Sequence, residues 1–162
     1  MTLKAIEING ENKRKIFSEI YMRSRGIVIK DSHILISHEV NTDYYLIPGG
    51  GLEKNETHEE CCTREVYEET GYIVKPTCHF LTINEYYEKF KFISHYFLCD
   101  IAEKTKQNPT VNEVKRGLIP EWINLNKMLE IYSRHNDFVI TNEEKRRAYL
   151  REYTALAEYF KK

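Results

Sequence analysis

One stretch of the sequence, residues 48 to 72, constrains the fold more than any other. It reads PGGGLEKNETHEECCTREVYEETGY, a proline and three glycines followed by a segment of helical character. Thr57 and Glu60 have the spacing of a capping box, and Gly71 is the expected stop, so a helix is predicted over residues 58 to 70. The stretch therefore predicts a glycine loop that leads directly into a capped helix.

Apolar segments of strand length surround this unit. Proline and consecutive glycines interrupt regular structure, so a loop is expected to begin at Gly49. The predicted strands, in chain order, are 24–30 and 33–37 as a hairpin, 44–47, 72–74, 80–87, 90–101 and a short one at 122–125.

Two further helices are expected near the C-terminus, a short one over residues 127 to 132 and a longer one beginning at a second capping box, Thr141 with Glu144. The apolar side chains of the longer helix recur at one-face spacing and are expected to pack on the sheet: Tyr149, Tyr153, Leu156 and Phe160. Its arginines are expected on the solvated face: Arg146, Arg147 and Arg151.

Composition narrows the functional classes. At 162 residues the chain fits a single domain, 1–162. Its 24 Lys and Arg nearly cancel 25 Asp and Glu, which argues against a large nucleic-acid surface.

The start lacks an apolar signal region and no run is long enough to span a membrane, so a cytoplasmic protein without a membrane partner is expected. The four cysteines lack a metal or disulfide spacing, so reduced thiols are expected.

The predicted helix after the glycines carries a carboxylate face. Glu65, Glu68 and Glu69 are spaced i, i+3, i+4, which brings their Cβ atoms within about 5 to 6 Å of one another. Like charges at that spacing destabilise a bare helix, and a hard dication such as Mg²⁺ prefers such oxygen ligands. In a chain whose acids are 21 Glu and 4 Asp, the cluster alone is also compatible with a solvated acidic face.

The wider pattern is more specific than the cluster. Residues 50 to 72 fit G-x5-E-x7-R-E-U-x-E-E-x-G-U, where U is apolar, with Tyr72 at the closing apolar position. A chance match of all seven fixed positions has a probability of about one in 10^5. The segment resembles the Nudix box, the signature of Nudix hydrolases.

The resemblance implies an α/β fold, the α/β/α sandwich with a mixed sheet, and a Mg²⁺-dependent hydrolase in which Mn²⁺ can substitute. The metal ligands that it implies are the carbonyl of Gly49 with Glu65, Glu68 and Glu69. Glu65 and Glu69 are also the catalytic carboxylates, and Arg64 and Glu56 brace the site. The family often dimerises, so a homodimer is one expectation.

The implied reaction is attack of water on a diphosphate bridge, with a carboxylate accepting the proton. The general base varies within the family between a box residue and one in a later loop. Glu113 is the candidate outside the box and Glu85 is its rival. Arg23 and Arg25, at the start of the first predicted strand, are candidates for binding a substrate phosphate, since guanidinium groups recognise phosphate bidentately.

The substrate class is open at this stage. Family members that hydrolyse ADP-ribose carry a Pro about 16 residues after the box, and those that hydrolyse dinucleoside polyphosphates a Tyr about 17 or 18 after it. Here those positions are Glu88, Lys89 and Phe90. By elimination, a nucleoside triphosphate pyrophosphohydrolase is the first expectation for this small-molecule nucleotide substrate. ADP-ribose or nucleotide-sugar hydrolysis is the alternative, and a non-catalytic nucleotide-binding domain is the alternative of another class.

Overall fold

The computed structural model describes residues 3–162 and contains one mixed sheet of eight strands. The strands lie in the order β1-β6-β7-β2-β3-β4, with β5 paired to β2 and β8 paired to β3. Their bounds are β1 Lys4–Asn9, β2 Glu19–Lys30, β3 His33–Glu39, β4 Tyr44–Leu46, β5 Gly49–Gly51, β6 Tyr72–Tyr87, β7 Phe90–Lys104 and β8 Leu118–Asn124. The sheet is mixed because β1 runs parallel to β6 and β2 parallel to β7, while the other pairs are antiparallel.

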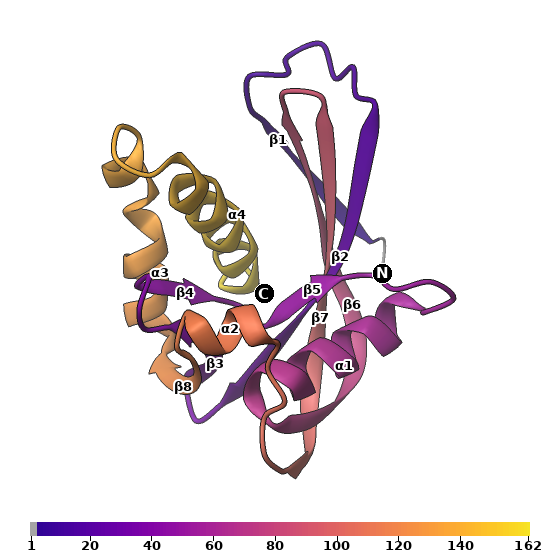
Figure 1. Ribbon diagram of the computed structural model, residues 1–162, viewed down its shortest axis with the longest axis vertical. Coiled ribbons are helices and arrows are strands. Elements are labelled where there is room, and N and C mark those ends of the chain that lie inside the picture. Colours follow the sequence, from indigo (N-terminus) through magenta and orange to yellow (C-terminus); the bar gives the residue numbers. More distant parts are fainter. Residues whose placement is uncertain (1–2) are drawn as a thin grey trace.

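The sheet divides into two parts beyond the β2–β3 hairpin. These two strands pair only at Ile29 with Ile34 and Lys30 with His33, and then diverge (Figure 1). One part consists of β1, β6, β7, β2 and β5, and the other of β4, β3 and β8. The glycine strand β5 pairs with β2 on the side where β3 has separated from it. The divergence therefore leaves room beside β5 for side chains from the helices.

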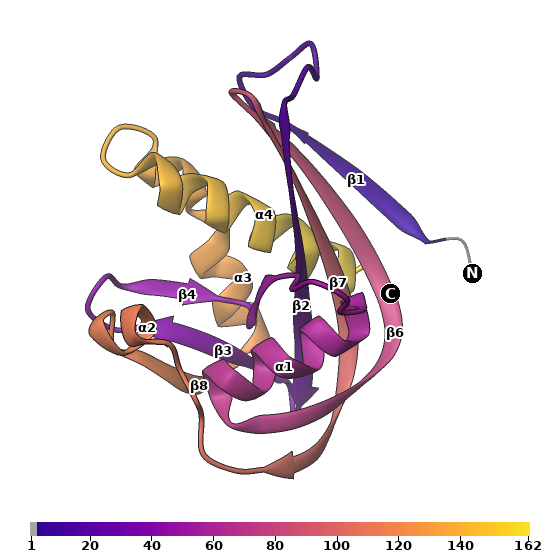
Figure 2. The ribbon, with the colours of Figure 1, turned by 45° about the vertical axis from the view of Figure 1, so that its right-hand side comes forward.

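Helices cover both faces of the sheet, as Figures 1 and 2 show. Their bounds are α1 His58–Thr70, α2 Val111–Lys115, α3 Leu125–Ser133 and α4 Glu143–Tyr159, with a short 3-10 helix η1 at His135–Phe138. α1 lies against one face, and α3 and α4 lie against the other. The predicted α/β/α sandwich is confirmed. No helix among residues 3–162 is long and apolar enough to cross a membrane.

The core beneath α1 is packed closely because β2 has a glycine there. A Cβ atom added to Gly26 would lie 2.7 Å from Val66 Cγ2 and 3.2 Å from Cys62 Sγ. Cys62 lies in turn 3.6 Å from Cys99 of β7, measured between the sulfurs. The small residues of α1 thus bring the helix and its carboxylates close to the sheet.

Both ends of α1, the helix that carries the carboxylates, lie where the sequence predicted them. Thr57 and Glu60 form the capping box, with each side chain accepting from the other residue's backbone N–H. Gly71 ends the helix in the left-handed region at φ 76°. The capping box predicted at Thr141 is wrong by one residue, because the Asn142 side chain accepts from the Lys145 N–H and begins α4.

Two other expectations need correction. Gly49–Gly51 is not a loop but the short strand β5, because the glycine backbone pairs with Arg23 to Arg25 of β2. The strands expected at 72–74 and 80–87 are one bulged strand, β6, whose register shifts around Pro76 and His79. A bulge disturbs the alternation of apolar side chains without ending the strand.

The C-terminal helix packs on the sheet as expected, but its faces differ from the prediction. Arg151 is not on a solvated face: it is 6% exposed and paired with Glu152. Phe160 lies just beyond the helix and is 43% exposed. The spacing of apolar residues identified the helix but gave no indication that it buries charges.

Gly71→Ala is expected to destabilise the protein. The left-handed conformation costs an L-residue about 1 to 2 kcal/mol, and an added Cβ would lie 2.5 Å from the Thr105 carbonyl oxygen. Gly51→Ala is the matched control, because a Cβ there meets nothing within 4 Å and the stability change should stay within about 0.5 kcal/mol. Urea unfolding measures both variants, and equal stabilities would contradict this account of Gly71.

Candidate active site

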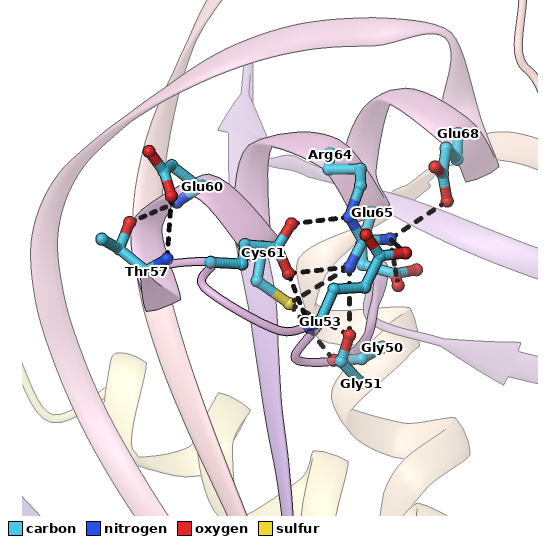
Figure 3. A network of polar contacts seen from close by, with 10 residues as sticks. Gly50, Gly51, Glu53, Thr57, Glu60, Cys61, Arg64, Glu65 and Glu68 are labelled. Atoms are coloured by element: carbon cyan, nitrogen blue, oxygen red, sulfur yellow. Dashed lines mark hydrogen bonds and ion pairs between the residues drawn. The ribbon is translucent and has the colours of Figure 1, made fainter.

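The carboxylate face of α1 lies against the glycine strand β5. Glu65 is 9% exposed, and its carboxyl group faces Gly50 so closely that an added Cβ there would lie 2.5 to 2.6 Å from its carbon and oxygens. Figure 3 shows Glu65 close to Gly50 and Gly51, with Glu68 further along α1. Only glycine permits this approach, because any side chain at residue 50 would displace the carboxylate.

Arg64 holds several of these carboxylates together (Figure 3). Its Nε and Nη2 donate to the two oxygens of Glu56 at 2.6 and 3.0 Å. Its Nη1 donates to Glu65 Oε1 at 2.8 Å and to Glu68 Oε2 at 3.3 Å, and its Nη2 also donates to the Gly51 carbonyl at 3.0 Å. These hydrogen bonds lower the pKa of Glu56 to about 2. The guanidinium therefore fixes the acidic cluster to β5.

Glu69 lies one turn further along α1 and reaches the neighbouring part of the sheet. It is 8% exposed and accepts a hydrogen bond from the Ser37 hydroxyl of β3. Burial raises the pKa of Glu69 to about 8, and the nearby charges of Glu65 and Glu113 act in the same direction. Burial also raises the pKa of Glu65. The surroundings therefore do not fully compensate the negative charges of the Glu65 and Glu69 carboxylates.

The predicted phosphate-binding arginines face the glycine strand from β2. Arg23 and Arg25 line a cavity of about 560 Å³ together with β5 and the apolar side chains of Tyr21, Met22 and Leu52. Arg25 is 4% exposed and donates from Nη1 to the Ile47 carbonyl at 2.9 Å. Burial and the charges of Arg25 and Arg151 lower the pKa of Arg23 to about 10. Arg23 is partly exposed whereas Arg25 is buried, so Arg23 is the more accessible of the two guanidinium groups.

The two candidates for a carboxylate outside the helix differ in setting. Glu113 is half-buried in α2, where its side chain accepts from the Thr110 N–H at 2.7 Å. Its negative charge raises the pKa of both Glu65 and Glu69. Glu85 of β6 is 2% exposed, with Oε2 3.8 Å from Arg151 Nη1 of α4. Electrostatics therefore connects Glu113 with the α1 cluster, whereas Glu85 belongs to a charge cluster under α4.

The donor set fits a divalent cation. Arg64 lies within 4 Å of four carboxylates, those of Glu53, Glu56, Glu65 and Glu68, so the cluster keeps a net negative charge. All the candidate ligands are oxygens, as hard dications prefer. In the conformation of residues 3–162, no three carboxylate, imidazole or thiol groups converge as a complete ligand set, since Arg64 and Ser37 engage the glutamates. A cation would share or take over the role of Arg64 beside Glu65 and Glu68.

Comparison with known proteins identifies the family. The structure places a capped helix with clustered glutamates against a glycine strand, on a mixed sheet between helices. The model of the NUDIX domain matches residues 20–142, and the chain belongs to this family. It is 35% identical over 75 residues to an ADP-ribose pyrophosphatase of Methanocaldococcus jannaschii, and the aligned segment covers 44% of each chain.

Other relatives are more distant. The chain is 26% identical over 106 residues to the mouse diphosphoinositol polyphosphate phosphohydrolase 3-alpha, covering 65% of this chain and 63% of that one. It thus matches less than two thirds of the length of either curated relative. Among solved structures, a NUDIX hydrolase from Nitrosomonas europaea superposes with a TM-score of 0.60 at 17% identity, over 83% of this chain and 88% of that one. A MutT protein from Methanosarcina mazei gives 0.59 at 19%, over 89% and 97%. These likenesses show the fold.

Sequence reasoning missed two polar residues next to this site. Ser37, which donates to Glu69, follows three apolar residues in β3, and a lone serine carries no pattern. Glu152 is fully buried 3.7 Å from Arg25 Nε, on a helix more than a hundred residues away in sequence. Only the tertiary fold brings these residues to the site.

Glu69→Gln is expected to change how the metal-free protein responds to pH. The folded-state pKa of Glu69, about 8, exceeds that of an unfolded glutamate, so its contribution to stability is lost as pH rises from about 4.5 through 8. The variant lacks this loss. Urea unfolding in EDTA should show the variant gaining on the wild type by at least about 1 kcal/mol between pH 5 and pH 8. If the free energies of unfolding of variant and wild type changed equally between pH 5 and pH 8, the argument that burial raises the pKa of Glu69 would be contradicted.

Proposed function

We propose that this protein hydrolyses a diphosphate bond in a nucleoside diphosphate linked to another group, with Mg²⁺ or Mn²⁺ as cofactor. The observation that carries the proposal is the contact of Glu65 with Gly50, which joins an acidic cluster to a glycine strand beside a cavity with two arginines. Nudix hydrolases generally use divalent metal ions. Glu65, Glu68, Glu69 and the Gly49 carbonyl are the proposed ligands.

The bound cation supplies Lewis acidity, neutralising phosphate oxygens and making water more acidic. The protein residues orient the substrate around it. Arg23 binds a phosphate oxygen pair through its guanidinium. The backbone of β5 lets the phosphates approach without side-chain interference. Arg64 holds Glu56, Glu65 and Glu68 in fixed rotamers, so its role is to position the other groups.

A carboxylate must accept the proton of the attacking water. Glu113 is the proposed general base outside the box, because its charge acts on Glu65 and Glu69. One of its oxygens is engaged with the Thr110 N–H at 2.7 Å, which leaves the other to accept a proton. The raised pKa of Glu69, about 8 in the metal-free protein, makes this buried group the alternative within the box. Glu85, paired with Arg151, is the weaker candidate.

A nucleoside triphosphate is the first proposed substrate. Two arginines and a glycine strand provide few positive charges for a diphosphoinositol polyphosphate, the compound in the name of the mouse relative. The Tyr21, Met22 and Leu52 side chains instead offer apolar surface to a nucleotide base. ADP-ribose or a nucleotide sugar is the second candidate. It is favoured by the 35% identity to the ADP-ribose pyrophosphatase of M. jannaschii.

The test is turnover of a panel containing nucleoside triphosphates, ADP-ribose and UDP-sugars, in H₂¹⁸O with Mg²⁺. Hydrolysis should place one ¹⁸O in a product phosphate, and no covalent enzyme adduct should accumulate during turnover, because water and not a side chain attacks the phosphorus. Release of a nucleoside monophosphate and pyrophosphate identifies the triphosphate reaction, while two monophosphates identify the alternative.

Two variants of α1 make the test specific. Glu69→Gln should lose about 10² to 10⁴ in kcat as a proposed ligand and proton acceptor. Glu59→Gln, an exposed glutamate in the first turn of the same helix, should keep kcat within about threefold. Absence of turnover of every diphosphate, or a Glu69→Gln variant as active as Glu59→Gln, would overturn the proposal.

A further inference from the structure

A buried group of charged and hydroxyl side chains lies between α4 and the sheet, on the face opposite α1. Glu152 is fully buried, and its Oε1 accepts from Arg151 Nε and Nη2 at 2.9 and 2.8 Å and from the Tyr96 hydroxyl at 3.2 Å. Arg25 Nε lies 3.7 Å from the same oxygen. Burying charges costs more than apolar packing of the same volume, so the fold does not need these residues to attach α4.

Arg25 connects this group to the glycine strand. It pairs with Gly49 across the β2–β5 ladder, and its Nη1 donates to the Ile47 carbonyl at 2.9 Å, two residues before β5 begins. A Cβ atom added to Gly49 would overlap Arg25 Cγ, so the arginine stem packs directly on the backbone of β5. Displacement of the Arg25 side chain would therefore shift the strand that faces Glu65.

The Arg25 guanidinium is held by the Ile47 carbonyl at one nitrogen and faces the Glu152 carboxylate with another. Arg25 Nε is buried and has no hydrogen-bond partner among the described residues, and Glu152 Oε2 is in the same condition. The two groups interact through charge at 3.7 Å, and Arg151 and Tyr96 hold the same carboxylate oxygen, Oε1, by hydrogen bonds. The position of Arg25 thus depends on a charge from α4.

We propose that Glu152 is a positioning residue that fixes β5 through Arg25, so that α4 is part of the catalytic machinery. The proposal rests on the proposed function, since β5 is taken to present the Gly49 carbonyl and the phosphate-binding backbone. Glu152 lies beyond residues 20–142, the part that matches the family model. The inference therefore concerns this chain's C-terminal helix.

A double-mutant cycle tests whether Glu152 acts through Arg25. Glu152→Gln keeps the shape and removes the charge, and kcat/KM should fall about 10- to 100-fold, as small misplacements of a positioning group do. Arg25→Lys should cause a loss of the same order. Because both break one link, the double variant should lose little more than either single variant. Losses that multiply would show that Glu152 acts independently of Arg25 and would overturn the proposal.

Hydrogen exchange of the metal-free protein gives a readout without activity. Glu152→Gln should speed exchange of the amides of residues 49 to 52 at least about tenfold, while the amides of α1 stay as protected as in the wild type. Faster exchange confined to α4 would identify a merely structural residue and overturn the proposal. Glu144→Gln, an exposed glutamate of the same helix, is the control and should change neither readout.

Two provisions keep the test decisive. If Glu152→Gln does not fold, Tyr96→Phe replaces it, because this variant removes one donor to Glu152 Oε1. It should give smaller changes in the same direction in both kcat/KM and hydrogen exchange. Unchanged amide exchange of β5 in Tyr96→Phe would then overturn the proposal. If the wild-type protein hydrolyses no diphosphate, the proposed function fails, while the exchange experiment still reports whether Glu152 fixes β5.

Discussion

Electrostatic repulsion on one helix face is the constraint around which this site is built. Glu65, Glu68 and Glu69 are held on adjacent turns of α1, and two of them are less than 10% exposed. Buried like charges oppose folding unless compensating groups surround them. Arg64 compensates on one side and the Ser37 hydroxyl on another, and the pKa values of Glu65 and Glu69 remain raised. The fold thus holds an incompletely neutralised acidic cluster in place.

Glycine is what makes that arrangement sterically feasible. Gly50 admits the Glu65 carboxylate, Gly26 admits Val66 of α1, and Gly49 admits the stem of Arg25. The first two let α1 approach the sheet from one face, while the third lets Arg25, which lies 3.7 Å from Glu152 of α4, pack on β5. Both faces of the sandwich therefore meet at a three-residue strand. The divergence of β2 from β3 provides the space for this meeting.

The sequence predicted the parts of this site that depend on local spacing. The capping box, the left-handed Gly71 and the i, i+3, i+4 glutamates are fixed by residues within one segment, and the helix bounds 58–70 are confirmed. The pairing of β5 with β2 could not be predicted, because a glycine run has no side-chain pattern that distinguishes a strand from a loop. Burial of Arg151 and Glu152 was missed for a related reason. Charged residues at helical spacing normally face solvent, and only the contact with Arg25 and Tyr96 reverses that expectation.

The central claim is that the α1 carboxylates form a cation site. The most direct measurement is the thermal unfolding midpoint of EDTA-treated protein before and after addition of Mg²⁺. Binding at 100 times Kd stabilises the folded state by about 2.7 kcal/mol, which for a domain of this size raises the midpoint by several degrees. The account predicts that rise for the wild type and for Glu59→Gln, and its loss in Glu65→Gln. A wild-type midpoint that Mg²⁺ leaves unchanged at millimolar concentration, or an equal rise in Glu65→Gln, would contradict it.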